Sequence, residues 1–199
     1  MFRPVETLTE KRREKIRQVL SKRQKELTLI LNNIHDPHNV SAILRSCDAF
    51  GVGWVHLYYS KEAFPVLGKK SSASAKKWVE CIRHKEARDM VESLQSQGFT
   101  LVRTGFSSTA LRVQDWDFSK PTAVILGNEH RGVEEALIKL VPHELYIPMV
   151  GMVQSFNVSV AAAIILYEAF RQREKKGLYA SPSLTPEELA EWELKWAQK

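Results

Sequence analysis

Residues 27–59 read LTLILNNIHDPHNVSAILRSCDAFGVGWVHLYY, and this stretch decides the fold class. It opens with an apolar run rich in branched side chains, residues 27–34, which is typical of a strand buried on both faces. Apolar residues then recur at helical spacing, at Val40, Ile43, Leu44 and Cys47. The run WVHLYY at 54–59 is apolar again. Strand, helix and strand in this order predict a parallel βαβ unit.

The same alternation continues toward the C-terminus. Further strands are expected at residues 78–82, 99–104, 122–127 and 144–148. Helices are expected at about 85–97, at about 131–141, and from Val158 to a stop at Gly177. A loop of small residues and lysines, GKKSSASAKK, fills residues 68–77. Six strands with helices between them predict an α/β fold with an open, mostly parallel six-stranded sheet.

Both ends of the chain differ from this centre. Residues 9–24 predict an amphipathic helix with a basic outer face, and residues 186–199 predict a second amphipathic helix after a short linker. We therefore expect a basic helical extension at residues 1–25, one domain at 26–177, and a linker with a helix at 178–199. Lysine and arginine exceed aspartate and glutamate by 29 to 23, which makes a polyanionic partner plausible but is also typical of a solvated surface.

The two cysteines, Cys47 and Cys81, lie far apart in apolar runs without a C-x-x-C motif or histidines at metal-ligand spacing. They predict two reduced thiols and no metal site. Charged residues interrupt the first 20 positions, and no apolar run approaches the ~20 residues of a membrane span. The sequence therefore predicts a cytoplasmic protein without a membrane partner.

Polar residues follow three of the expected strands. They lie in NVSAILR at 39–45, LGNEHRG at 126–132 and PMVGMVQSFNVS at 148–159. Ligands of parallel sheets bind at the carboxyl ends of the strands, so these segments are the candidate site. None of them contains G-x-G-x-x-G or G-x-x-x-x-G-K, which disfavours a nucleotide-dependent oxidoreductase.

Taken one at a time, these polar residues have two interpretations. Asn39 stands where a helix N-cap is expected, and capping is its more common role. The helical pattern turns Arg45 away from the core, toward a ligand or into a surface ion pair with Asp48. Glu129 could bind a ribose or orient a base, or it could cap the helix expected near residue 131.

Together and in this order, the three segments resemble the signature motifs of the SpoU-type RNA ribose methyltransferases of the SPOUT superfamily. The matching patterns are N-x-x-A-x-x-R, G-N-E-x-x-G and I-P-M-x-G-x-x-x-S-x-N-V-S. The similarity extends from about Arg17 to Tyr179, with Phe156 where leucine is usual. The basic N-terminal helix and the C-terminal extension make the chain similar to the TrmH type, which methylates guanosine 18 in the D-loop of tRNA.

The resemblance implies a deep C-terminal trefoil knot, an S-adenosylmethionine cofactor bound in the knot, a homodimer and a tRNA substrate, without a metal. It implies catalytic roles for Arg45, Asn39, Glu129, Ser155 and Asn157. It places cofactor contacts at Thr104, Gly127, Ile147, Met149, Met152 and Phe156. With tRNA as the partner, the expected RNA phosphate contacts are Lys11, Arg12, Arg13, Arg17, Arg23, His38, Arg171 and Arg173.

Two alternatives stay within the same fold. One is a ribose methyltransferase acting on ribosomal RNA or on the tRNA anticodon loop. Ribosomal relatives often carry a separate N-terminal RNA-binding domain, which the 26 residues before the first strand cannot supply, and anticodon-loop relatives usually lack both extensions. The other is a catalytically idle RNA-binding protein, against which the complete set of motif residues argues.

Overall fold

A computed structural model describes residues 8–65 and 75–199 of the chain. The loop expected at 68–77 therefore lies largely outside the described residues. Its last residues belong to a short helix, α3 (Ala75–Trp78).

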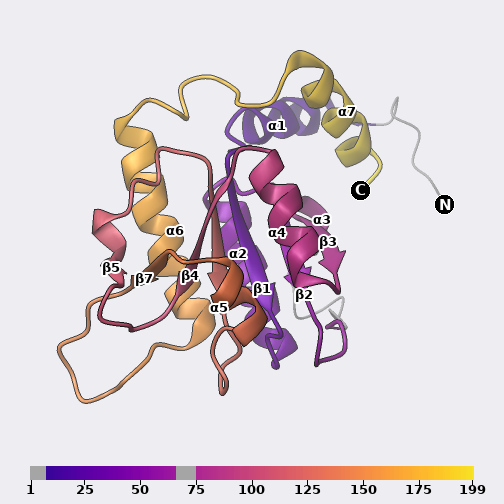
Figure 1. Cartoon of the computed structure of the whole chain (residues 1–199). Helices are drawn as coiled ribbons and strands as arrows, with labels where there is room; N and C mark the ends of the chain where they lie inside the picture. Colours follow the sequence, from indigo (N-terminus) through magenta and orange to yellow (C-terminus); the bar gives the residue numbers. More distant parts are fainter. Residues whose placement is uncertain (1–7, 66–74) are drawn as a thin grey trace.

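A parallel sheet forms the centre of the molecule (Figure 1). Its strands are β1 (Leu27–Asn32), β2 (Trp54–Tyr58), β3 (Glu80–His84), β4 (Thr100–Thr104), β5 (Leu111–Arg112), β6 (Thr122–Leu126) and β7 (Glu144–Tyr146). They lie in the order β3-β2-β1-β6-β4-β7-β5, and every neighbouring pair is parallel. The predicted α/β fold with a parallel sheet is confirmed. The predicted number of six strands is one too few, because two-residue β5 is too short to leave a periodic pattern.

Helices cover both faces of the sheet (Figure 1). On one face, α2 (Pro37–Ala49) and α6 (Val158–Lys175) bury an apolar stripe each against the larger hydrophobic core. On the other face, α4 (Ala87–Ser96) and α5 (Glu135–Leu140) pack on a second core. All six residues of β1 are buried, as its continuous apolar run predicts for a central parallel strand.

Three elements begin at other residues than the sequence predicts. Helix α2 begins at Pro37, because Asp36 is its N-cap and accepts a hydrogen bond from the backbone of His38 (2.8 Å). Asn39 therefore lies inside the first turn, and the capping interpretation of this residue is wrong. Helix α5 begins only at Glu135, since residues 128–132 form a closed turn. Strand β3 begins at Glu80, two residues later than predicted.

The two helical extensions pack against each other at one end of the molecule (Figure 1). Helix α1 (Glu10–Leu20) buries Ile16 and Leu20 beside Trp196 of α7 (Pro186–Ala197). Arg17 of α1 also donates a hydrogen bond to Glu193 of α7 (2.9 Å). Helices α1 and α7 thus pack together, a contact that neither amphipathic pattern could predict.

The strand order is interleaved. Strand β6 inserts between β1 and β4, and the chain then crosses β4 to pair β7 with it. The position of a strand within the sheet depends on long-range pairing, so the periodicity of the sequence could not predict this order. The knot itself stays a prediction of the family resemblance.

Among the described residues, no helix is both long enough and apolar enough to cross a membrane. Cys47 is buried, Cys81 is half-buried, and both are free thiols. In the same part of the chain, no three His, Cys, Asp or Glu side chains are grouped to hold a metal ion.

A buried histidine pair makes the stability of the fold sensitive to acid. His56 of β2 is 5% exposed, and its Nδ1 lies 2.8 Å from Nε2 of His84 in β3. Burial, with a smaller contribution from the charge of His84, lowers the pKa of His56 to about 4. As the pH falls below about 6.5, His56 therefore becomes protonated in the unfolded chain but stays neutral in the folded chain.

We expect the free energy of unfolding to fall by roughly 3 kcal/mol between about pH 6.5 and pH 4 because of His56. Urea unfolding at several pH values measures this slope. His56→Gln should flatten it, whereas the same change at exposed His143 should not. An equally steep slope in His56→Gln would assign the acid sensitivity to other groups.

Candidate active site

A cavity of about 400 Å³ lies at the carboxyl ends of β4, β6 and β7. Residues from all three strand ends line it, together with the start of α6. This is the edge at which parallel sheets bind their ligands. Its apolar wall includes Leu126, Val133, Leu145, Ile147, Phe156 and Val158.

The turn after β6 requires glycine at its first position. A Cβ atom on Gly127 would collide with the backbone of Gly132 and Val133, because the chain folds back on itself there. Asn128 closes the turn: its backbone exchanges two hydrogen bonds with Gly132, each 2.9 Å. Its side-chain oxygen accepts from the backbone of His130 and Arg131, and its amide donates to the carbonyl of Asn33 (2.6 Å). The turn is thus fixed to the end of β1.

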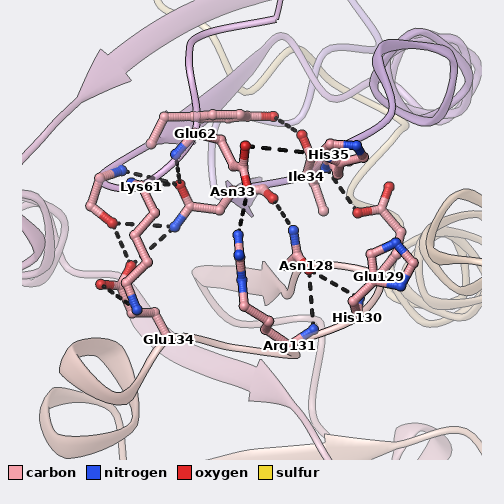
Figure 2. Close-up of polar contacts among 12 residues, drawn as sticks. Asn33, Ile34, His35, Lys61, Glu62, Asn128, Glu129, His130, Arg131 and Glu134 are labelled. Atoms are coloured by element: carbon pink, nitrogen blue, oxygen red, sulfur yellow. Dashed lines mark hydrogen bonds and ion pairs between the residues drawn. The ribbon is translucent and has the colours of Figure 1, made fainter.

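Glu129 projects from this turn toward the start of α2, and Figure 2 shows it beside His35. Its carboxylate accepts hydrogen bonds from the backbone N–H of His35 (2.9 Å) and of Asp36 (3.3 Å). It also accepts one from the side-chain amide of Asn39 (2.8 Å). Glu129 therefore holds the loop that leads into α2 and does not cap α5.

The protonation of Glu129 follows from these contacts. Partial burial raises the pKa of this carboxyl, but the hydrogen bonds from His35, Asn39 and Asp36 together outweigh burial and lower it. Glu129 is therefore ionised at neutral pH. It is the only acidic residue that lines the cavity among the described residues, and no lysine or arginine does.

Asn39 and Asn157 connect the three motif segments. The amide of Asn157 donates to the side-chain oxygen of Asn39 (3.1 Å), and Asn39 donates to Glu129. Asn157 is also the N-cap of α6, where it accepts from the backbone of Ser159 (2.8 Å). Four of the five residues expected to be catalytic are thus brought together, because Ser155 lines the same cavity.

Arg45 is the fifth, and it lies apart from them. It is exposed on α2, six residues or about 9 Å along the helix axis from Asn39, and it does not line the cavity. The ion pair with Asp48 that the sequence left open does not form. Asp48 instead binds the buried guanidinium of Arg23 (2.5 Å), and Arg45 is exposed on the face of α2 that points away from the core.

Four of the six expected cofactor contacts line the cavity, namely Thr104, Gly127, Ile147 and Phe156. Met149 and Met152 do not, and Met152 is almost fully exposed. Both belong to the loop between β7 and α6, which extends away from the body of the protein (Figure 1). That these residues bind a cofactor stays a prediction.

Glu144, which the motif patterns do not include, shapes one wall of the cavity. This carboxylate is 5% exposed, forms an ion pair with Arg103 (2.5 Å) and accepts from the backbone of Ser107 (2.8 Å). A Cβ atom on Gly105 would collide with it. Glu144 thus holds the turn that brings Gly105 and Phe106 to the cavity. An acidic residue at the start of an apolar strand was its only visible signal.

Two of the eight expected RNA contacts are contradicted. Arg23 is fully buried between Asp48 and the ring of Trp196, and Arg173 is 1% exposed and donates to Gln24 and Phe118. Their charges are used within the fold and cannot reach a phosphate. The other six are at least partly exposed: Lys11, Arg12, Arg13, Arg17, His38 and Arg171. Of these, Arg13, Arg17 and Arg171 already form ion pairs with glutamates.

Known proteins resemble this chain in sequence and in structure. The chain is 46% identical over 188 residues to a tRNA (guanosine(18)-2′-O)-methyltransferase of Thermus thermophilus, covering 92% of this chain and 96% of that one. The crystal structure of the Aquifex aeolicus TrmH/SpoU tRNA modifying enzyme superposes with a TM-score of 0.88 at 39% identity, covering 94% of this chain and 95% of that one.

A more distant structure contains a cofactor. The SpoU methyltransferase AviRb from Streptomyces viridochromogenes, in complex with S-adenosylmethionine, has a TM-score of 0.63 at 27% identity, over 77% of this chain and 59% of that one. Residues 26–167 match the family model described as the SpoU rRNA methylase family. With more than half of its length matched by that model, the chain belongs to the SpoU rRNA methylase family.

Proposed function

We propose that this protein transfers the methyl group of S-adenosylmethionine to the ribose 2′-hydroxyl of guanosine 18 in the D-loop of tRNA. The observation that carries the proposal is the hydrogen-bonded chain Glu129–Asn39–Asn157 at the edge of the cavity. It unites three segments in a protein 46% identical to a tRNA (guanosine(18)-2′-O)-methyltransferase over nearly its whole length. We place the reaction in the cytoplasm, in keeping with the two free thiols.

The cavity at the carboxyl ends of β4, β6 and β7, here called the first cavity, fits S-adenosylmethionine in size and charge. Its volume of about 400 Å³ lies in the range of small-molecule sites, and most of its wall is apolar. Gly127 belongs to this wall, and the backbone of Gly132 and Val133 fills the space of a Cβ atom there, so the turn stays closed beside the cavity. The ionised Glu129 and the absence of lysine or arginine among the described lining residues favour a cationic sulfonium.

The cofactor supplies an activated methyl group, whose transfer joins carbon to the 2′-oxygen, breaks the carbon–sulfur bond and leaves a thioether. The protein must align the hydroxyl with that carbon and assist the loss of its proton. An arginine side chain offers hydrogen-bond donors only, so Arg45 does not serve as the acceptor of this proton. Its guanidinium orients an RNA phosphate or stabilises the developing alkoxide, and a substrate phosphate accepts the proton.

The other motif residues hold the site in place. Glu129 fixes the turn before α2 through three hydrogen bonds, and Asn39 passes this restraint to Asn157 at the start of α6. The wall of the cavity and the two helices are therefore set relative to each other before a substrate binds. Such preorganisation avoids a cost of reordering in the transition state.

Mapping ribose methylation in tRNA from a strain that lacks the gene tests the proposal. The D-loop guanosine should lose its 2′-O-methyl group, and the purified protein should restore it in the presence of S-adenosylmethionine. Loss at only a ribosomal or anticodon-loop position would assign the chain to those substrates instead. No change at any ribose would favour an idle RNA-binding protein.

We further propose that the protein acts as a homodimer. Apolar side chains are exposed on the loop before α6 and along one stripe of α6 itself, namely Val150, Met152, Val153, Val160 and Tyr167. Val160 and Tyr167 are seven residues apart, so they share one helix face. The family resemblance implies that residues of one subunit lie beside the cofactor of the other, and we propose that the exposed Arg45 is one of them.

Light scattering should therefore find a dimer at low micromolar concentration. Val160→Glu should shift it to a monomer and abolish methyl transfer, because burying a charge in an apolar interface is strongly unfavourable. Leu194→Glu is a control on a different face, since Leu194 of α7 is exposed to a similar extent. A monomer with full activity would contradict the proposal.

A further inference from the structure

A second cavity, of about 220 Å³, lies on the other side of the turn after β6. It opens at the carboxyl ends of β1 and β6, beside the start of α5. Asn128, Gly132 and Val133 line both cavities, so the two share a wall. Neither the motifs nor the reaction described above gives this second cavity a role.

Asn32 at the end of β1 lines the second cavity and carries an unused donor. The residue is 1% exposed, and its side-chain oxygen accepts from the backbone of Glu134 (2.7 Å). Its amide nitrogen has no hydrogen-bond partner within residues 8–65 and 75–199. A buried amide donor without an acceptor is unfavourable, and such groups in folded proteins usually have a reason.

The next residue, Asn33, has a strained backbone conformation, and hydrogen bonds of its side chain hold it in place. Its φ of 50° is the only positive one at a non-glycine residue in the described chain. Its side-chain oxygen accepts from three successive backbone N–H groups, those of residues 60–62, and its amide donates to Ser60 and Glu134 (Figure 2). Strain that is maintained by such a network is typical of functional sites.

The rim of the second cavity carries both kinds of hydrogen-bonding group. The Lys61 ammonium lies 3.8 Å from the Glu134 carboxylate, and the Arg131 guanidinium binds Glu62 (2.5 Å). Lys61 and Arg131 are more than half exposed and can turn toward a ligand, whereas the Glu134 side chain is 14% exposed and fixed. A ligand that fits must therefore present acceptors to Asn32, Lys61 and Arg131 and a donor to Glu134.

Guanine has this pattern. Its O6 and N7 are acceptors, and its N1–H and 2-amino groups are donors on the adjoining edge. Adenine has an amino group in place of O6, so it would place a donor against the donor of Asn32. A volume of about 220 Å³ is smaller than the roughly 300 Å³ of pockets for drug-sized ligands and suits a single base.

We propose that the second cavity holds the guanine base of the nucleotide that is methylated, with the amide of Asn32 donating to O6. The shared wall allows one nucleotide to reach both cavities, with its base in the second and its ribose at the mouth of the first. This inference depends on the proposed function and adds to it the residues that select the base.

The test compares tRNA transcripts with guanosine, 2-aminopurine or adenosine at the target position. The unmodified protein should methylate the guanosine transcript with a kcat/KM at least about ten-fold above that of the other two, because a base-specific hydrogen bond is worth that much. Asn32→Asp keeps the acceptor for Glu134 and removes the donor, so it should lower kcat/KM for guanosine about ten-fold and erase most of the preference.

Lys61→Ala provides a second variant that keeps the buried network, and it should also reduce the preference. Lys139→Ala is its matched control: Lys139 is an exposed lysine paired with Glu135 (2.7 Å) on α5 but does not line the cavity. This control should keep the preference. The dissociation constant for S-adenosylmethionine, measured by calorimetry, should stay unchanged in all three variants.

Equal losses on all three transcripts, or an unchanged preference in folded Asn32→Asp and in Lys61→Ala, would overturn the base assignment. The first result would indicate a contact with the RNA backbone. If the unmodified protein methylates guanosine 18 while the variants keep its preference, only this inference fails. If it methylates none of the transcripts, the proposed function fails and the inference with it.

Discussion

Arg45→Ala is expected to lower the rate of methyl transfer by on the order of 100- to 1000-fold, the loss seen when one preorganised donor to a developing charge is removed. Arg45 is exposed on α2, and its side chain forms no hydrogen bond or ion pair with another described residue. Its removal should therefore leave thermal stability, dimer formation and S-adenosylmethionine affinity nearly unchanged. An effect on kcat without an effect on binding is typical of a transition-state interaction.

Single-turnover methylation at saturating tRNA and cofactor measures this effect. Arg45→Lys should recover little of the rate, because a point charge cannot replace the planar fork that holds a phosphate or an alkoxide. Arg88→Ala removes another exposed arginine, on α4, and serves as the control. Near-normal turnover in Arg45→Ala would show that Arg45 is not catalytic and that the proposed mechanism is wrong.

Glu129→Gln is expected to damage both binding and turnover, in contrast to Arg45→Ala. The carboxylate accepts from His35, Asp36 and Asn39, and a glutamine offers only one oxygen to these three donors. At least one donor then faces the new amide. Hydrogen bonds to a charged group contribute about 1.5–3 kcal/mol each, so kcat/KM should fall on the order of 100-fold.

Because Glu129 lines the first cavity, its replacement should also weaken S-adenosylmethionine binding, which calorimetry measures directly. Glu92→Gln makes the same chemical change on the exposed face of α4 and should leave both quantities unchanged. Retention of full cofactor affinity in Glu129→Gln would mean that neither the charge nor the anchoring of the loop before α2 matters to the first cavity.

The local pattern of the sequence predicts most of the fold. The unbroken apolar run of β1 and the helical spacing of Val40, Ile43 and Leu44 depend only on which faces of an element are buried, and the structure buries these residues. Strand β5 has no such pattern, since two exposed residues cannot show a period. The joint packing of α1 with α7 was equally hidden, because an amphipathic face does not identify its partner.

Some residues of the candidate site could be identified from the sequence, and others only from the structure. Motif order and spacing identify Asn39, Glu129, Ser155 and Asn157, which all come to one cavity or to its edge. They do not identify Glu144, Asn32 or Asn33, whose roles come from contacts between separate strand ends.

The sequence by itself determined the class of fold, the buried faces and the motif residues, because these follow from the period of a helix or strand and from residue type. Only the tertiary structure showed that Arg23 is buried while Arg45 is exposed, a difference that composition cannot give. Arg23 is buried because Asp48 neutralises it and Trp196 covers it, whereas Arg45 lies on the exposed face of α2 without Asp48 as a partner. A buried charge needs a partner, and a linear sequence does not record which distant residue provides one.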